Sequence, residues 1–211
     1  MPVIVVDEVR KSFRGVRVLD GASVTVERGR CYAVVGPNGS GKSVLLRLMC
    51  RLLAPDSGSV TIAEEHLSAD RRFPEDFGVI IDGPGYLPFA TGFENLRRLA
   101  SIRDAIGRDE ILAAMAEVGL DAGLRQRVRN YSLGMRQKLG IAQAIMEHQR
   151  VLILDEPFNG LDRSSAERVR ALLRRHRDEG RTIVFTSHDE RDVDALATDV
   201  VELDAGRLTP R

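Results

Sequence analysis

Gly36-Pro37-Asn38-Gly39-Ser40-Gly41-Lys42-Ser43 is the stretch that decides the fold of this 211-residue chain. It fits the pattern G-x-x-x-x-G-K-[ST], follows the apolar run 31–35 and opens a helical pattern over 42–53. Its glycines let the backbone curl so that successive N–H groups face phosphate oxygens, and the helix N-terminus adds partial positive charge. Lys42 supplies a charge for the β- and γ-phosphates, and the Ser43 hydroxyl can bind Mg²⁺. A plain glycine-rich turn with a capping serine does not explain the full match in this context.

A second apolar run, 151–154, ends in Asp155-Glu156. Ligands of open α/β sheets bind at the carboxyl ends of the strands, where the phosphate loop also lies. We expect Asp155 to hold a water on Mg²⁺, and Glu156 to orient or deprotonate an attacking water. A strand that ends in Asp-Glu is weak evidence alone. With the phosphate loop it predicts a nucleotide-binding protein, but it does not separate a kinase, a switch GTPase and a motor ATPase.

The segment 131–137, Tyr-Ser-Leu-Gly-Met-Arg-Gln, opens another helix with Ser132 at the N-cap and no side chain at Gly134. It predicts a second helix N-terminus that is suited to an anion. One explanation is a head-to-tail dimer in which each subunit completes the nucleotide site of the other. A well-capped surface helix is the alternative.

The remaining patterns predict an α/β fold: a P-loop core with a mostly parallel sheet flanked by helices, an N-terminal antiparallel β portion, and a helical subdomain at about 90–147. We treat 1–211 as a single domain, with 1–89 and 148–211 forming the β portion and the core. Turns are expected at Asp20-Gly21 and Arg28-Gly29, and capping boxes at 91–94 and 187–190. Strands are predicted at 3–9, 16–26, 31–35, 59–63, 78–81, 151–155, 182–186, 200–203 and 206–208, and helices at 42–53, 92–104, 109–118, 132–147 and 163–178.

Composition excludes several classes of protein. The 31 basic and 31 acidic residues cancel, which disfavours a basic nucleic-acid binder. Cys31 and Cys50 lie among apolar residues, so we expect buried free thiols and a reducing compartment rather than a disulfide scaffold. No apolar run approaches the roughly 20 residues of a membrane span, and the start lacks the pattern of a signal peptide.

The three segments, together with Asn159-Gly160-Leu161-Asp162 and His188, resemble the nucleotide-binding subunit of ABC transporters along almost the whole chain. Segments 131–137 and 159–162 are most similar to the antibiotic- and bacitracin-exporter-like branch. The resemblance implies an ATPase that uses ATP and Mg²⁺ and powers a separate membrane permease through ATP-driven head-to-tail dimerisation. The partners would be a second copy or a similar ATPase subunit, and a permease that docks near Asp82–Asn95. The chain would be cytoplasmic and peripheral at the inner face of the cell membrane, with no nucleic-acid partner.

The resemblance also implies a role for each matching residue. Phe13 would stack on adenine, although a plain strand phenylalanine fits equally well, and Asp162 would lie at the dimer seam. His188 would sense the γ-phosphate, although a lone histidine is usually just a satisfied polar residue. The catalytic set is Lys42, Glu156 and His188; the nucleotide-binding set is Phe13, Gly36, Pro37, Asn38, Gly39, Ser40, Gly41, Lys42, Ser43, Val44, Ser132, Gly134, Gln137 and Asp162; and the Mg²⁺ set is Ser43, Asp82 and Asp155.

A few positions depart from the family pattern. Asp82 stands where the family usually has Gln, so its charge would attract Mg²⁺ and repel the γ-phosphate; an ordinary strand-end Asp is the alternative. Val44 replaces a hydroxyl, and Arg163 replaces a frequent Pro. None of these changes removes Lys42 or Glu156, so we expect an active ATPase.

Two rival functions remain open at this stage. A soluble, non-transport ATPase with the same cassette would act on DNA, ribosomes or another protein. The chain has no long coiled-coil insertion and a single cassette, unlike the repair, condensation and translation-factor relatives. A small-molecule kinase would leave the segment 131–137 without a purpose.

Overall fold

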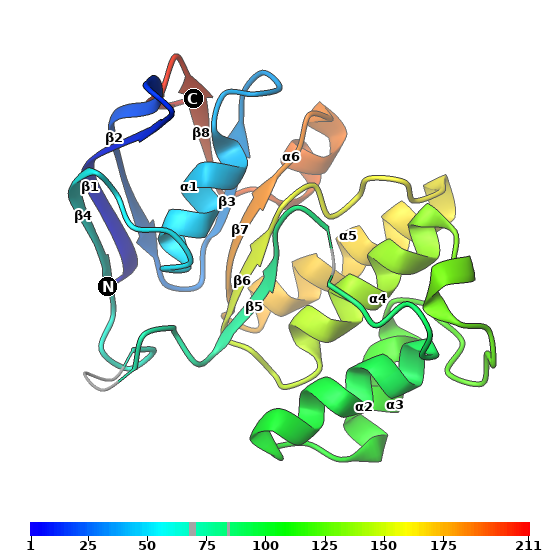
Figure 1. Ribbon diagram of the computed structural model, residues 1–211. Helices are drawn as coiled ribbons and strands as arrows, with labels where there is room; N and C mark the ends of the chain where they lie inside the picture. The colour runs from blue at the N-terminus through cyan, green and yellow to red at the C-terminus, as the bar shows by residue number, and fades with distance from the viewer. Residues whose placement is uncertain (68–70, 84) are drawn as a thin grey trace.

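The computed structural model describes residues 1–67, 71–83 and 85–211, and it arranges them as two sheets with helices between and beside them (Figure 1). A three-stranded antiparallel sheet has the order β2-β1-β4, and a six-stranded sheet has the order β5-β6-β7-β3-β8-β9. The strands are β1 (Pro2–Phe13), β2 (Val16–Glu27), β3 (Cys31–Val35), β4 (Ser57–Ile62), β5 (Phe77–Ile80), β6 (Val151–Leu154), β7 (Thr182–Thr186), β8 (Asp199–Asp204) and β9 (Arg207–Pro210).

The larger sheet is parallel from β5 through β8, and only β9 is antiparallel to its neighbour. Every residue of β3, β6 and β7 is buried, as expected for central strands covered by helices on both faces. These three strands are continuous apolar or β-branched runs, so the sequence predicts them closely. The predicted α/β class and the antiparallel N-terminal portion are confirmed.

Helices cover both faces of the larger sheet. The helical elements are α1 (Lys42–Met49), α2 (Gly92–Arg103), α3 (Arg108–Glu117), the 3₁₀ turn η1 (Val128–Asn130), α4 (Leu133–Ile145), α5 (Arg163–Asp178) and α6 (Glu190–Leu196). In Figure 1, α1 lies between the two sheets, whereas α4 and α5 lie on the opposite side of the larger sheet with α2 and α3 beyond them. None of the helices within the described ranges is long and apolar enough to cross a membrane.

Two apolar clusters hold these layers together. One joins α1 to the antiparallel sheet and to one face of the larger sheet. The other joins α2, α3, α4 and α5 to the opposite face, including the fully buried Phe185. The helical segment therefore shares its core with the sheet, and the subdomain boundaries at about 90 and 147 stay a prediction. Cys31 and Cys50 are buried free thiols, as predicted, and burial raises the pKa of each to about 12.

Some local predictions are wrong. Helix α1 ends at Met49, where Leu53 was predicted. Asp20-Gly21 is not a turn: β2 runs through it, and the pairing shift between Val9↔Ala22 and Arg10↔Asp20 leaves Gly21, with φ +78°, as the bulged residue.

The second predicted capping box is also wrong. Helix α6 is capped by the Asp189 side chain, which accepts from the Arg191 N–H at 2.9 Å, and Ser187 lies outside the helix. The box at 91–94 is confirmed, since Thr91 and Glu94 exchange side-chain and backbone hydrogen bonds. The helix predicted at 163–178 is confirmed as α5, and its buried face carries Val169, Leu172 and Leu173 and ends in the buried His176.

Candidate functional site

The loop 36–43 connects β3 to α1 at the carboxyl edge of the larger sheet. Gly36 has φ +143°, and a Cβ there would collide with the carbonyl oxygen of Leu203 on β8. Gly41 has φ +104°, and a Cβ there would lie 2.8 Å from Cγ1 of Val18. Both positions therefore require glycine, for conformation and for space. The Lys42 ammonium donates to the carbonyl oxygens of Gly36 at 2.8 Å and Pro37 at 3.0 Å, which places the charge inside the curl of the loop.

The ends of three parallel strands meet beside this loop. The Ser43 hydroxyl donates to Oδ2 of Asp155 at 2.6 Å. The Thr186 hydroxyl, at the end of β7, donates to Oδ1 of Asp155 at 2.7 Å and accepts from the Glu156 N–H at 2.7 Å. Both oxygens of Asp155 are thereby fixed, and the backbone that carries Glu156 is tied to the neighbouring strand.

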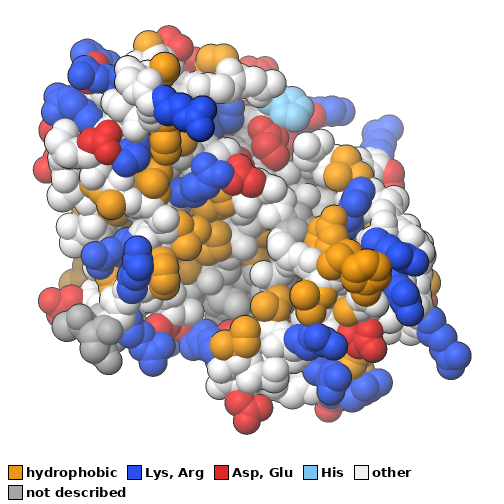
Figure 2. Space-filling view, in the orientation of Figure 1, with side chains coloured by type: hydrophobic (Ala, Val, Ile, Leu, Met, Phe, Trp, Pro, Cys, Tyr) orange, Lys and Arg blue, Asp and Glu red, His pale blue; other side chains and the backbone are white. Residues whose placement is uncertain are grey.

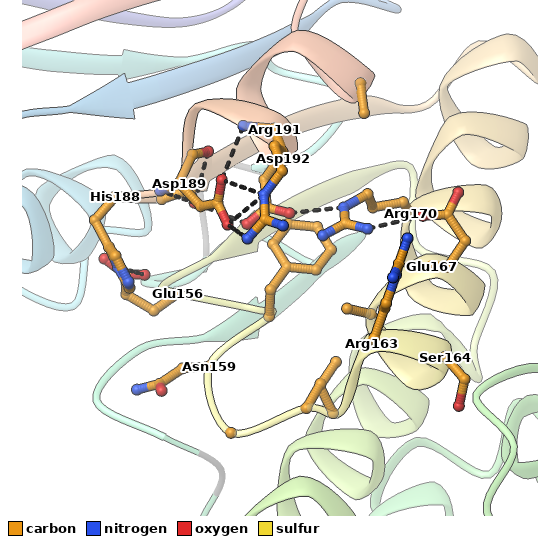
Figure 3. A pocket seen from close by; sticks show the side chains of 16 residues that line it. Glu156, Asn159, Arg163, Ser164, Glu167, Arg170, His188, Asp189, Arg191 and Asp192 are labelled. Atoms are coloured by element: carbon orange, nitrogen blue, oxygen red, sulfur yellow. Dashed lines mark hydrogen bonds and ion pairs between the residues drawn. The ribbon is translucent and has the colours of Figure 1, made fainter.

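Glu156 and His188 form the outer part of this arrangement. Oε2 of Glu156 lies 3.0 Å from Nδ1 of His188, whose side chain is 72% exposed (Figure 3). The Glu156 backbone has φ +47°, a left-handed conformation that is rare outside glycine. The buried Gln137 of α4 donates from its amide to the Glu156 carbonyl oxygen at 3.2 Å, so helix α4 supports that strained backbone.

Two cavities open on either side of Glu156. The first, of about 390 Å³, is lined by the phosphate loop and by the residues Val18, Val44, Asp155 and Glu156. The second, of about 930 Å³, lies between the start of α5 and α6 and contains Glu156, His188, Arg163, Arg170 and Arg191 (Figure 3). A ligand bound on the phosphate loop would thus meet Glu156 at the boundary of two accessible spaces.

The segment 131–137 packs against the loop that follows β6. Ser132 is the exposed N-cap of α4, and its hydroxyl accepts from the Met135 N–H at 3.1 Å. A Cβ on Gly134 would lie 2.8 Å from the Gly160 carbonyl oxygen, so the helix needs a glycine to approach this loop. Leu133, beside it, is 54% exposed. Tyr131 is buried and its hydroxyl accepts from the Gly92 N–H at 3.2 Å, which ties α4 to α2.

Asp162 caps α5. Its carboxylate accepts from the Ser165 N–H at 2.8 Å and from the Ser164 and Ser165 hydroxyls at 2.7 and 3.0 Å. These hydrogen bonds, first of all that from the Ser165 N–H, lower the pKa of Asp162 to about 2. The carboxylate is therefore ionised at neutral pH and is fixed at the exposed start of the helix.

Two predicted site residues, Phe13 and Asp82, make contacts other than those described so far. Phe13 is 42% exposed at the end of β1, and the Lys11 ammonium lies over its ring, 5.6 Å from the ring centre. Stacking of Phe13 on adenine stays a prediction. Asp82 has φ +58°, and its carboxylate pairs with the guanidinium of Arg47 on α1. A role of Asp82 as a Mg²⁺ ligand stays a prediction, and the carboxylate would first have to leave Arg47.

Thr186 belongs to the site, although no sequence motif indicates it. It is fully buried and holds both Asp155 and Glu156, yet in the sequence it is only the last residue of an apolar strand. One signal was available: a hydroxyl at the carboxyl end of the strand that neighbours β6 must face the same sheet edge as Asp155.

Comparisons with known proteins agree on one family. The family profile described as ABC transporter matches residues 19–159. An uncharacterized ABC transporter ATP-binding protein of Bacillus subtilis, YybJ, is 39% identical over 94% of this chain and 91% of its own length. The bacitracin transport ATP-binding protein BcrA of Enterococcus faecalis is 33% identical over 98% of this chain and 68% of its own length. Among solved structures, a dimeric ATP-binding cassette in a post-hydrolysis state with ADP and Pi superposes with a TM-score of 0.87 at 21% identity, covering 99% of this chain and 97% of that one.

Proposed function

Because the chain belongs to the ABC transporter family of ATP-binding proteins, we propose that it binds and hydrolyses ATP to drive a separate membrane permease. The observation that carries the proposal is one continuous set of contacts. It runs from the phosphate loop at Ser43 through Asp155 and Thr186 to Glu156 and His188.

The chemistry follows from this geometry. The Lys42 ammonium and the loop N–H groups hold the β- and γ-phosphates. Glu156 orients a water and takes its proton as the water oxygen attacks the γ-phosphorus; the bond from that phosphorus to the bridging oxygen breaks, and ADP leaves with the oxygen. His188 lies next to the Glu156 carboxylate, where it can meet the γ-phosphate oxygens. Catalysis is then positioning together with electrostatic stabilisation.

The residues present fit a Mg²⁺ ion. Ser43 and Asp155 offer hard oxygen ligands 2.6 Å apart beside the loop, and Mg²⁺ prefers one or two such protein ligands together with phosphate and water. Bound there, the ion would neutralise the charge of the β- and γ-phosphates. We assign Ser43 and Asp155 to it.

The active form is a head-to-tail dimer. Ser132 lies at the exposed N-terminus of α4, where a helix can bind an anion. Among the described residues, the phosphate loop of the same chain makes no use of this N-terminus. Bound to the γ-phosphate of a partner subunit, Ser132 and Gly134 would complete a composite site, with Asp162 near the seam. The dimeric cassette with ADP and Pi, which shares this fold, supports the arrangement.

The permease docks on the segment between β5 and α2, within Asp82–Asn95. Leu87 and Phe89 are 46% and 66% exposed there, and Figure 2 shows hydrophobic side chains gathered around this region. Pro84, in the same segment, lies outside the described residues. BcrA, a bacitracin transport protein, supports an exporter. The chain would be peripheral at the inner face of the cell membrane.

The decisive experiment uses the variant Glu156→Gln, with Glu64→Gln as a matched control at an exposed position. We expect Glu156→Gln to lower kcat by about 10²–10⁴-fold, to keep ATP binding, and to dimerise with ATP and Mg²⁺. Wild-type turnover in this variant would contradict the assignment.

The same variant identifies the partner. Tagged Glu156→Gln, recovered from native cells with ATP and Mg²⁺, should bring down a multi-span membrane protein in near-equal amount. Recovery of soluble proteins or nucleic acid alone, with the dimer still forming, would leave the ATPase intact and refute transport.

A further inference from the structure

A buried ion pair lies behind the loop that carries His188. Nε of Arg170, on α5, donates to Oδ1 of Asp192 on α6 at 2.7 Å, and the side chains are only 14% and 4% exposed (Figure 3). Burying two charges is costly unless they are paired and hydrogen-bonded. A pair in this position therefore calls for an explanation beyond general stability.

Asp192 extends the contact to both neighbours of His188. Its Oδ2 accepts from the Ser187 hydroxyl at 3.0 Å, and the oxygen of that hydroxyl accepts from the Asp189 N–H at 3.1 Å. Ser187 is buried, whereas His188, which lies between Ser187 and Asp189 in the chain, is exposed. The backbone on each side of His188 is thus anchored to Asp192, and the imidazole projects from this anchor toward Glu156.

Arg170 also contacts the loop that carries Glu156. Its guanidinium lies 5.6 Å from the ring centre of Phe158, two residues after Glu156. Phe158 packs edge-on against Phe185 of β7 at 6.2 Å. One guanidinium therefore touches the supports of both loops whose side chains meet at the Glu156–His188 contact of 3.0 Å.

We propose that Arg170 is a positioning residue for hydrolysis: through Asp192 and Ser187 on one side and Phe158 on the other, it sets His188 against Glu156. The inference rests on the proposed function. Arg170 lines the second cavity and does not line the first, whose walls include the phosphate loop. It therefore affects the rate of the chemical step and not the affinity for ATP. A planar guanidinium is needed because it lies over the Phe158 ring while its Nε donates to a carboxylate, which an ammonium does not do equally well.

The test is Arg170→Lys, with Arg174→Lys as the matched control. Arg174 lies one turn further along α5 and also ties α5 to α6, through the Ala195 carbonyl oxygen at 3.3 Å. We expect Arg170→Lys to lower the single-turnover hydrolysis rate by about tenfold to 100-fold at unchanged ATP affinity, since small misplacements of catalytic groups cost that much. Arg174→Lys should hydrolyse ATP at the wild-type rate.

A double-mutant cycle separates positioning from general weakening. In a His188→Ala background, Arg170→Lys should slow hydrolysis by less than about twofold, because the residue it positions is gone. If Arg170→Lys folds poorly, Ser187→Ala serves as a second variant, because it removes the hydrogen bond from Ser187 to Asp192 by changing only a small side chain. It should lower the hydrolysis rate in the same way.

Each of three results would overturn the proposal: wild-type hydrolysis by both Arg170→Lys and Ser187→Ala, an equal loss in Arg174→Lys, or an undiminished Arg170→Lys effect without His188. Failure of the proposed function looks different, because the wild-type protein itself would then show no hydrolysis that depends on Glu156.

Discussion

The hydroxyl of Thr186 donates to Oδ1 of Asp155 at 2.7 Å, which locks the carboxylate beside the phosphate loop against the neighbouring strand. The same oxygen accepts from the Glu156 N–H, so one buried hydroxyl serves both acidic residues. Positions of this kind allow little substitution, because the partner groups are buried and have fixed geometry.

Thr186→Val should lower both stability and activity. The methyl group of valine replaces the hydroxyl and leaves Asp155 and the Glu156 N–H without their partner, which costs about 1–3 kcal/mol. Thr186→Ser keeps the hydroxyl and should retain most of the hydrolysis rate. Urea unfolding and steady-state ATPase assays measure the two effects, and equal behaviour of the two variants would contradict the assignment.

Lys42→Met should weaken ATP binding by about tenfold or more, since a hydrogen bond to a charged group contributes about 1.5–3 kcal/mol. Lys138→Met is the matched control, because Lys138 lies on α4 and contacts the Gly119 carbonyl oxygen rather than the loop. Calorimetric titration with ATP distinguishes the two variants. Similar affinities would argue against the role of Lys42.

Gly36→Ala and Gly15→Ala should differ in cost although both glycines have positive φ. At Gly15, with φ +82°, nothing lies within 4 Å of the place that a methyl group would occupy, so only backbone strain of about 1–2 kcal/mol is expected. At Gly36 the methyl group would also collide with Leu203, so the loop must shift and ATP affinity should fall. Chemical unfolding and ATP titration of both variants test this difference, and equal results would show that the loop tolerates the methyl group.

The stability of the protein should fall between pH 7 and pH 5, and His176 should account for part of that fall. Burial, with Arg181 next in importance, lowers the pKa of His176 to about 3 from an ordinary value of 6.5. Below pH 6.5 the unfolded chain binds a proton that the folded chain does not, so the stability is complete above that pH and is lost as the pH falls. The contribution is of order 1–2 kcal/mol by about pH 5.

The variant His176→Gln should show a flatter decline of unfolding free energy over this range. His66 is buried too and its pKa is also lowered, so some decline will remain. An unchanged slope in His176→Gln would show that His176 is protonated in the folded protein.

The sequence predicts the parts of the site that depend on short-range patterns. The phosphate loop, the Asp155-Glu156 pair and the capped start of α4 each follow from a motif next to an apolar run. The structure adds the contacts between segments that are distant in the chain. The resemblance assigns Gln137 to the nucleotide, but in the structure Gln137 is buried and donates to the Glu156 carbonyl oxygen. Its spacing of four residues from Ile141 places both on the same face of the helix, which could have indicated that Gln137 is buried.

Other positions could not be predicted from the sequence. Helix α6 is capped by Asp189 and not by Ser187, because the Ser187 hydroxyl donates its hydrogen bond to the Asp192 carboxylate. Asp82 is paired with Arg47 only because the fold brings the end of β5 beside α1. In both cases tertiary partners decide between local conformations that the sequence leaves equally favourable.

The close approach of Leu203 to Gly36 has a consequence for biosynthesis. Strand β3 pairs with β7 and β8, both made long after it, so the phosphate loop emerges from the ribosome well before the backbone that shapes it. At roughly 5–20 residues per second the delay is on the order of ten seconds. During that time the nascent chain contains every residue of the loop but lacks the strands that hold it in shape, so ATP cannot assist its folding until β8 has been made.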